Sequence, residues 1–71
     1  MEFNSKVFST NLRAERARRG LTQAELAEAA GVSADAVFKY ENGVAVPGVD
    51  KAFSMAAVLG CTPNDLLGWK A

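Results

Sequence analysis

Apolar and polar positions repeat with the period of an α-helix along most of the chain. Phe8, Leu12 and the aliphatic stem of Arg16 recur on one face, which predicts a first helix over residues 5–19. Gly20 follows, and glycine commonly ends a helix. The pattern therefore predicts an amphipathic helix at the start of the chain.

Two further helices are predicted with almost no chain between them. Thr22 and Glu25 have the spacing of a capping box, and Gly31 stands where the second helix ends. Only Val32 separates this glycine from Ser33, a good N-cap for a third helix. Because glycine takes a positive φ easily, the two helices are predicted to form a tight helix-turn-helix. Their inward faces would consist of Leu26, Ala27 and Ala30 in the second helix and Val37 and Tyr40 in the third.

Two more helices complete the pattern. Asn42 and Gly43 end the third helix, and residues 44–48 form a loop in which Pro47 helps to start a fourth helix that ends at Gly60. Its inward face would consist of Val49, Ala52, Phe53, Ala56 and Leu59. A fifth helix would begin at Thr62, Pro63 and Asp65 and carry Leu66 and Leu67. No strand pattern is present, so we expect an all-α bundle of five helices in one domain, residues 1–71, with a core over about residues 5–67.

Length and composition narrow the class of protein. The chain has 71 residues with eight basic and eight acidic side chains, so its net charge favours no particular partner. It contains no histidine and one cysteine, Cys61, which we expect to be a buried structural thiol. An enzyme is therefore the poorest interpretation, and no cofactor or metal is expected. No segment has the ~18 apolar residues of a membrane span, so a cytoplasmic protein is expected.

The predicted helix-turn-helix has two interpretations on loop length and periodicity alone: a DNA-binding motif or an ordinary helical hairpin. The run from Asn11 to Ser33, with its Leu-Thr-Gln, Leu-Ala and Gly-Val-Ser segments, continues through Glu41-Asn-Gly and Pro47. It resembles the phage-repressor-like (Cro-like, xenobiotic-response-element) helix-turn-helix family. The segment from Met55 to Leu67 resembles that family's last two helices, so the resemblance extends over about residues 8 to 67. It implies binding to double-stranded DNA with the third helix in the major groove.

The resemblance also implies roles for individual residues. Thr22, Gln23 and Asn42 match positions that contact the DNA backbone, with Gln23 hydrogen-bonding a phosphate. Thr22 and Asn42 also have capping roles, whereas a solvent-facing glutamine in the first turn would gain nothing structurally. Arg16 and Glu41 match a pair that ties the first helix to the end of the third, which is a structural role.

Base reading is implied for four groove-facing positions: Ser33, Ala34, Asp35 and Lys39. Lys39 has the donors for guanine O6 and N7, and the methyl group of Ala34 suits a thymine. Asp35 has two open interpretations. It could accept from cytosine N4, or it could be present because the helix dipole favours an acid in the first turn.

The distribution of charge along the chain and the apolar residues outside the core do not determine which partner the protein binds. Residues 13–19 carry net charge +3 and residues 20–47 carry −3, and the loop Val44–Val46 lacks the basic residues common in the family, so modest DNA affinity with a shallow salt dependence is expected. Six apolar residues have no evident place in the core: Phe3, Val7, Phe38, Val44, Val46 and Trp69. Leu66, Leu67 and Trp69 are the expected start of a two-fold interface.

Two functions follow from these features. The leading hypothesis is a homodimeric, sequence-specific DNA-binding transcriptional regulator that acts as a repressor. The alternative is a protein-interaction module of the same fold, such as an antitoxin, co-regulator or anti-repressor, with weak or no DNA binding. The acidic motif and the apolar loop at residues 44–46 favour this alternative.

Overall fold

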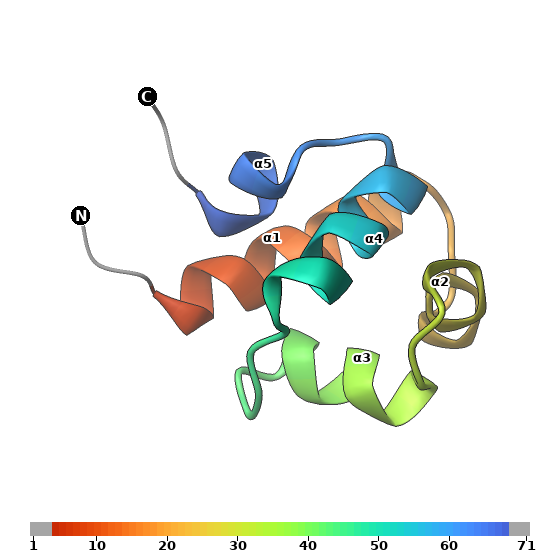
Figure 1. The fold of residues 1–71 in the computed structure, drawn as a ribbon, viewed down its shortest axis with the longest axis horizontal. Coiled ribbons are helices and arrows are strands. Elements are labelled where there is room, and N and C mark those ends of the chain that lie inside the picture. The colour runs from red at the N-terminus through yellow and green to blue at the C-terminus, as the bar shows by residue number, and fades with distance from the viewer. Residues whose placement is uncertain (1–3, 69–71) are drawn as a thin grey trace.

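A computed structural model describes residues 4–68, which form five helices and no strand (Figure 1). The helices are α1 (Ser5–Arg18), α2 (Gln23–Ala30), α3 (Ala34–Glu41), α4 (Val49–Leu59) and α5 (Pro63–Leu67). The predicted all-α, five-helix fold class is therefore confirmed. Phe3 and Trp69, for which the sequence predicts no place in the core, lie outside the described residues.

Local signals account for where most helices begin. The predicted capping box of Thr22 and Glu25 is formed, and the predicted helix start at Thr62 forms a second one with Asp65. In each box the threonine hydroxyl accepts the backbone N–H of the acidic residue, whose carboxylate accepts the backbone N–H of the threonine in return. The N–H of Thr62 lowers the pKa of the Asp65 carboxyl because it stabilises the charged form. The start of α4 differs from the prediction, since its N-cap is Gly48 and Pro47 lies before the first turn.

The helices pack around one apolar core (Figure 1). α1 packs against α3 and α5, and α2 packs against α3 and α4. In the view of Figure 1, α2 is seen nearly end-on while α3 lies across the picture, so their axes cross steeply. The fully buried side chains at the centre come from all five helices: Phe8, Leu12, Leu26, Val37, Met55, Leu59 and Leu66.

The inward face of α4 is rotated from the predicted one. Val49 is 87% exposed and Phe53 is 63% exposed, so these two residues do not belong to the core as expected. Met55 is fully buried in their place, beside Ala56 and Leu59. The periodicity did not distinguish these faces because apolar residues cover more than half of the circumference of α4, with Asp50, Lys51 and Ser54 on the remainder, so more than one apolar stripe is possible.

Arg19, the C-cap residue of α1, connects the end of α1 to the last turn of α4 by a hydrogen bond. Arg19 Nε donates to the backbone oxygen of Leu59 at 2.7 Å. Gly60 caps α4 with a φ of 71°, a conformation that glycine adopts without strain. A Cβ added at Gly60 would overlap the guanidinium of Arg19, so the absence of a side chain makes room for this contact.

Candidate nucleic-acid interface

A short turn sets the position of α3 relative to α2. Gly31 has a φ of 73°, and the N–H of Val32 donates to the oxygen of Ala27 at 3.0 Å, which closes the end of α2. Ser33 then caps α3, its Oγ accepting the N–H of Ala36 at 3.0 Å. The side chain of Ala27 is buried against the core, and its small size lets the two helices approach closely.

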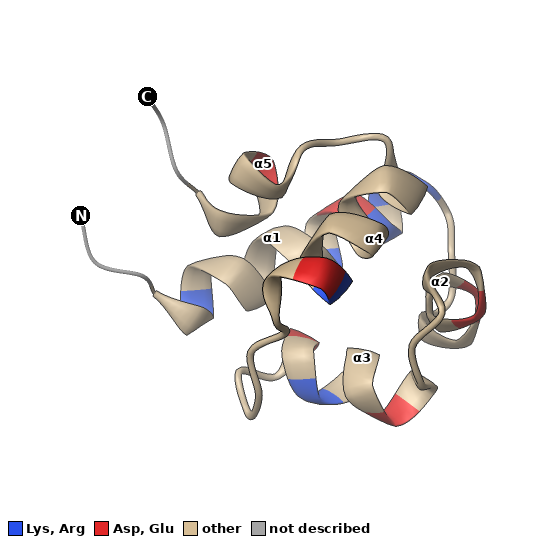
Figure 2. Ribbon diagram, in the orientation of Figure 1, with Lys and Arg blue, Asp and Glu red and all other residues tan. Residues whose placement is uncertain are grey.

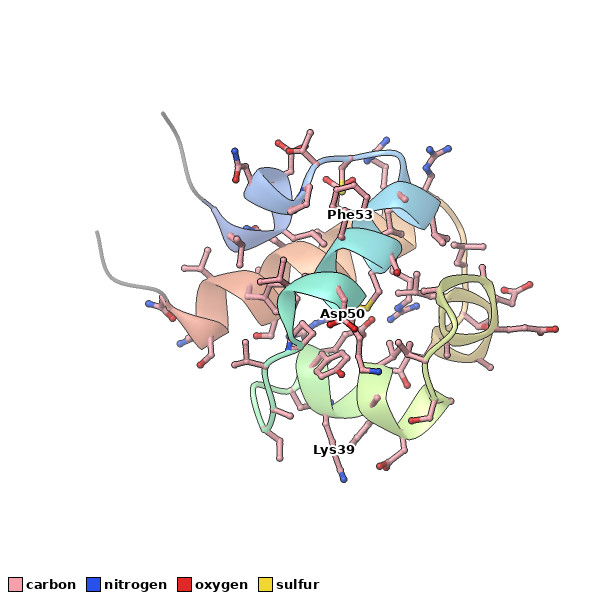
Figure 3. The ribbon with its side chains drawn as sticks, in the orientation of Figure 1. Lys39, Asp50 and Phe53 are labelled. Atoms are coloured by element: carbon pink, nitrogen blue, oxygen red, sulfur yellow. The ribbon has the colours of Figure 1, made fainter. Side chains whose placement is uncertain are left out.

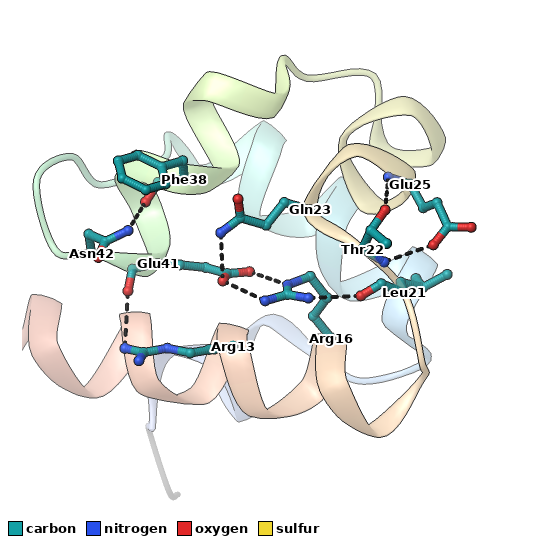
Figure 4. Close-up of polar contacts among 9 residues, drawn as sticks. All are labelled: Arg13, Arg16, Leu21, Thr22, Gln23, Glu25, Phe38, Glu41 and Asn42. Atoms are coloured by element: carbon teal, nitrogen blue, oxygen red, sulfur yellow. Dashed lines mark hydrogen bonds and ion pairs between the residues drawn. The ribbon is translucent and has the colours of Figure 1, made fainter.

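A buried carboxylate joins three helices on the inward side of α3 (Figure 4). Glu41 is only 2% exposed, and Arg16 of α1 donates to it twice, from Nε at 2.6 Å and from Nη2 at 2.9 Å. Gln23 Nε2 of α2 donates to the same carboxylate at 3.2 Å. Arg16 Nη1 also donates to the oxygen of Leu21 at 2.8 Å. The hydrogen bonds to Glu41 raise the pKa of Arg16, and every buried side-chain nitrogen or oxygen of residues 4–68 has a partner.

The environment of Gln23 corrects one step of the sequence reasoning. The expected solvent-facing glutamine is half-buried, and its amide helps to hold the carboxylate of Glu41. A structural benefit therefore exists for this residue without any DNA. No local pattern could have indicated it, because Glu41 lies 18 positions away.

The outward side of α3 carries the four predicted base-reading residues. Ser33, Ala34, Asp35 and Lys39 are all exposed. Lys39 Nζ and Asp35 Oδ2 lie 3.0 Å apart, so these two charged side chains pair with each other across one helical turn. Figure 3 shows Lys39 pointing away from the rest of the molecule at the edge formed by α3.

The three predicted backbone-contact residues lie along the junction of α1, α2 and α3 (Figure 4). Thr22 caps α2, Gln23 holds Glu41, and Asn42 Nδ2 donates to the oxygen of Phe38 at 2.7 Å. Each thus has a structural partner within the chain. The side chains of Thr22 and Asn42 remain exposed.

A cationic residue that the sequence reasoning did not single out lies beside this row. Arg13 Nη2 donates to the backbone oxygen of Glu41 at 3.2 Å, next to Asn42. Both residues line a cleft of about 400 Å³ between the first half of α1 and the end of α3, as does Lys6. The cluster of arginines in residues 13–19 was the available signal, and helical spacing alone did not show that Arg13 reaches α3.

Charge is divided between the helices (Figure 2). α2 carries only the acids Glu25 and Glu28, while α1 carries four basic residues, Lys6, Arg13, Arg16 and Arg18. On α3, Lys39 is the single cation. The helix-turn-helix formed by α2 and α3 is therefore acidic, and the basic side chains lie mainly on α1.

Apolar residues outside the core follow the predictions in part. Val7, Phe38, Val44 and Val46 are exposed, as expected. The expectation of an interface at Leu66 disagrees with the structure, because this side chain is fully buried in the core and has no surface left for a second copy. Leu67 is half-buried against the core, and Trp69, the third interface residue expected, lies outside the described residues.

Three further observations on the described residues concern the cysteine, membrane spans and metal ligands. Cys61 is half-buried rather than buried, and desolvation raises the pKa of its thiol. No helix within residues 4–68 has the length and apolar character needed to cross a membrane. The same residues contain no group of three acidic or cysteine side chains arranged to hold a metal ion.

Comparison with known proteins decides the family. A family model described as helix-turn-helix matches residues 12–66, which is most of the chain. The chain belongs to this helix-turn-helix family. The family comprises DNA-binding transcription regulators of the phage-repressor and Cro type, as the sequence indicated. No curated protein matches the sequence of this helix-turn-helix protein.

Solved structures of regulators have the same fold. The clp gene regulator ClgR from Corynebacterium glutamicum is 32% identical, with a TM-score of 0.83 over 89% of this chain and 67% of that one. The restriction-modification controller protein C.AhdI from Aeromonas hydrophila is 27% identical, with a TM-score of 0.84 over 87% and 94% of the two chains. The c2 repressor of phage P22, solved with a synthetic operator, is 28% identical, with a TM-score of 0.81 over 84% and 91%.

Proposed function

We propose that this helix-turn-helix protein is a sequence-specific transcriptional repressor of the cytoplasm that binds double-stranded DNA as a homodimer. The observation that carries the proposal is the contrast between the two sides of α3. The inward side is fixed by Val37, Tyr40 and the buried Glu41, while the outward side presents Ser33, Ala34, Asp35 and Lys39 to solvent. A helix held in this way can enter a major groove without rearrangement of the fold.

Contacts with phosphates would fix the protein on the duplex. Gln23 Nε2 has a second N–H besides the one that it gives to Glu41, and the hydroxyl of Thr22 and the amide of Asn42 are exposed. Neutral donors of this kind set the register on DNA without choosing a base. Arg13, beside Asn42, would add a charged contact from α1.

Base choice would come from α3. In the absence of DNA, Lys39 is paired with Asp35, and both side chains are at least half exposed. An exposed pair of this kind is weak, so Lys39 can exchange the carboxylate for the O6 and N7 acceptors of a guanine. The Ala34 methyl group would then lie near a neighbouring thymine methyl.

The direct test is fluorescence anisotropy with a randomised duplex and with a site selected from a random pool, at several salt concentrations. We expect preference for the selected site and a salt slope that corresponds to a few phosphates. Gln23→Ala should weaken binding to all duplexes, because a backbone contact is lost, whereas Lys39→Ala should weaken the selected site most.

Two controls keep this test specific. Lys51→Ala removes an exposed lysine from α4, which the proposal does not place on DNA, and should leave binding unchanged. Thermal melts of each variant show whether the fold is retained, since Gln23 also bonds Glu41. If the wild-type protein binds no duplex selectively even at low salt, the proposal is wrong.

A second function is favoured by a separate observation. The loop between α3 and α4 presents Val44 and Val46, 70% and 50% exposed, where a phosphate-binding loop would carry cations. A protein-interaction module, such as an antitoxin, co-regulator or anti-repressor, would use this apolar loop to bind another protein. In that case Val44→Ser should abolish function, while Gln23→Ala and Lys39→Ala leave it intact.

A further inference from the structure

The solvent-facing surface of α4 carries an apolar stripe beside the polar residues Asp50, Lys51 and Ser54. Val49, Phe53 and Ala57 are all exposed and stand four residues apart, so they form one stripe along the helix. Ala52, Met55, Ala56 and Leu59 form the neighbouring face of the helix, which is buried in the core. A phenylalanine that is 63% exposed beside two further exposed apolar residues marks a candidate contact surface.

We propose that the stripe formed by Val49, Phe53 and Ala57 is the surface through which two copies of this chain pair, with their α4 helices antiparallel about a two-fold axis. In such a contact each residue near the start of the stripe meets one near its end. The large Phe53 of one copy then lies beside the small Ala57 of the other, which leaves room for the ring. The stripe is thus complementary in shape to itself.

Charge at the two ends of the stripe supports a second copy over any other occupant. Asp50, in the first turn of α4, is exposed and has no ion pair within residues 4–68. Arg19 is held against the last turn of α4 by its bond to the oxygen of Leu59. An antiparallel contact brings Asp50 of each copy toward Arg19 of the other, so opposite charges meet twice. Figure 3 shows Asp50 near the start of α4 and Phe53 further along the same helix.

The contact would leave the DNA-binding side free. In Figure 3, Lys39 points from the edge of α3, away from the side of α4 that carries Phe53. Two copies joined through α4 can therefore present both α3 helices to one duplex. The inference deepens the proposed function, because it rests on the homodimer and names the surface that forms it.

The first experiment measures the dissociation constant of the dimer by sedimentation equilibrium for Phe53→Ser and for the matched control Phe38→Ser. Both residues are exposed phenylalanines on helices, but Phe38 lies on α3, outside the stripe. We expect Phe53→Ser to weaken the dimer at least about tenfold and Phe38→Ser to leave it unchanged. The proposal is wrong if the wild-type chain stays monomeric over its soluble range, or if both variants change alike.

The second experiment tests the antiparallel arrangement through charge. Asp50→Arg alone places a second cation near Arg19 of the other copy, and Arg19→Glu alone places two acids together, so each variant should be more monomeric than the wild type. A mixture of the two variants restores opposite charges at both ends of the contact, because the arginine introduced at position 50 of one chain faces the glutamate introduced at position 19 of the other, while Asp50 of the second chain faces Arg19 of the first. The mixture should therefore form mixed dimers. The double variant Asp50→Arg with Arg19→Glu restores opposite charges at both ends and should dimerise again. A double variant that stays as monomeric as the single ones would overturn the arrangement.

Measurements of DNA binding distinguish a failure of this interface from a failure of the proposed function. A duplex that carries one half-site needs only one subunit, so Phe53→Ser should bind it as the wild type does while losing affinity for the two-site duplex. If the wild type dimerises through α4 but binds neither duplex, the proposed function fails and the interface stands. If the wild type binds the half-site but Phe53→Ser still dimerises fully, the interface fails and the proposed function stands.

Discussion

The two sides of α3 carry the same kind of ion pair in different surroundings. On the inward side, Arg16 reaches Glu41 across 25 positions of the chain, and the carboxylate is 2% exposed. On the outward side, Lys39 reaches Asp35 within one helical turn, and both side chains are largely in water. Burial makes their effects different: the inner pair holds α3 to α1, whereas the outer pair is exposed and weak.

The energies of the two pairs should differ accordingly. A buried carboxylate that loses its cation is left without compensation, which costs about 3–5 kcal/mol. An exposed pair one turn apart on a helix contributes about 0.3–0.5 kcal/mol. The difference can be measured by removing one partner on each side of α3.

The largest expected effect is the loss of the inner pair. Arg16→Ala leaves Glu41 buried with only Gln23 as its side-chain partner, and we expect the free energy of unfolding to fall by about 3 kcal/mol. For a chain of this length the Tm would drop by more than about 10 °C, measured by circular dichroism. Lys39→Ala, which removes the cation of the outer pair, should leave the Tm almost unchanged. Equal melting temperatures for the two variants would contradict the comparison.

The next effect separates two neighbouring apolar residues. Val37 is fully buried on the inward side of α3 and Phe38 is 52% exposed on the outward side. Val37→Ala should cost about 2 kcal/mol, because buried methyl groups are lost and a small cavity remains. Phe38→Ala, although it removes more atoms, should change stability by less than about 0.5 kcal/mol in urea unfolding. A larger loss for Phe38→Ala would mean that the outward side is also packed.

The smallest effect distinguishes the two interpretations of Asp35. Asp35→Asn frees Lys39 and removes a negative charge from the side proposed to face phosphates, so affinity for any duplex should rise roughly threefold. Anisotropy at low salt with random and selected duplexes measures this change. If affinity falls instead, and only for the selected site, Asp35 accepts from a base.

The parts of the fold that the sequence predicts are those decided within a few residues. Thr22 with Glu25 and Thr62 with Asp65 form their capping boxes because each partner lies three positions away, inside one turn. The glycine at position 31 ends α2 where predicted because a left-handed cap needs no distant partner. These signals are sufficient to place five helices in order.

Contacts between distant parts of the chain were predicted less well. Only the resemblance placed Arg16 near Glu41, and nothing indicated that Gln23 would join them. The inward face of α4 was wrong at Val49 and Phe53, since apolar residues cover more than half of that helix and the neighbouring helices determine which ones are buried. At the candidate interface the residue types and their order follow from the family, while the partners of each side chain follow from packing.

The contact of Arg19 beside Gly60 also affects how Arg19 binds a partner, because it reduces the conformational entropy that this side chain can still lose. A free arginine side chain gives up about 2 kcal/mol of rotamer freedom when it becomes fixed. Arg19 has already lost part of that freedom on folding, because its Nε is bound to the oxygen of Leu59 and its guanidinium lies where a side chain at position 60 would be. An anion that meets Arg19 therefore finds a donor that is ordered beforehand, and less entropy is lost in the encounter than at a mobile surface arginine.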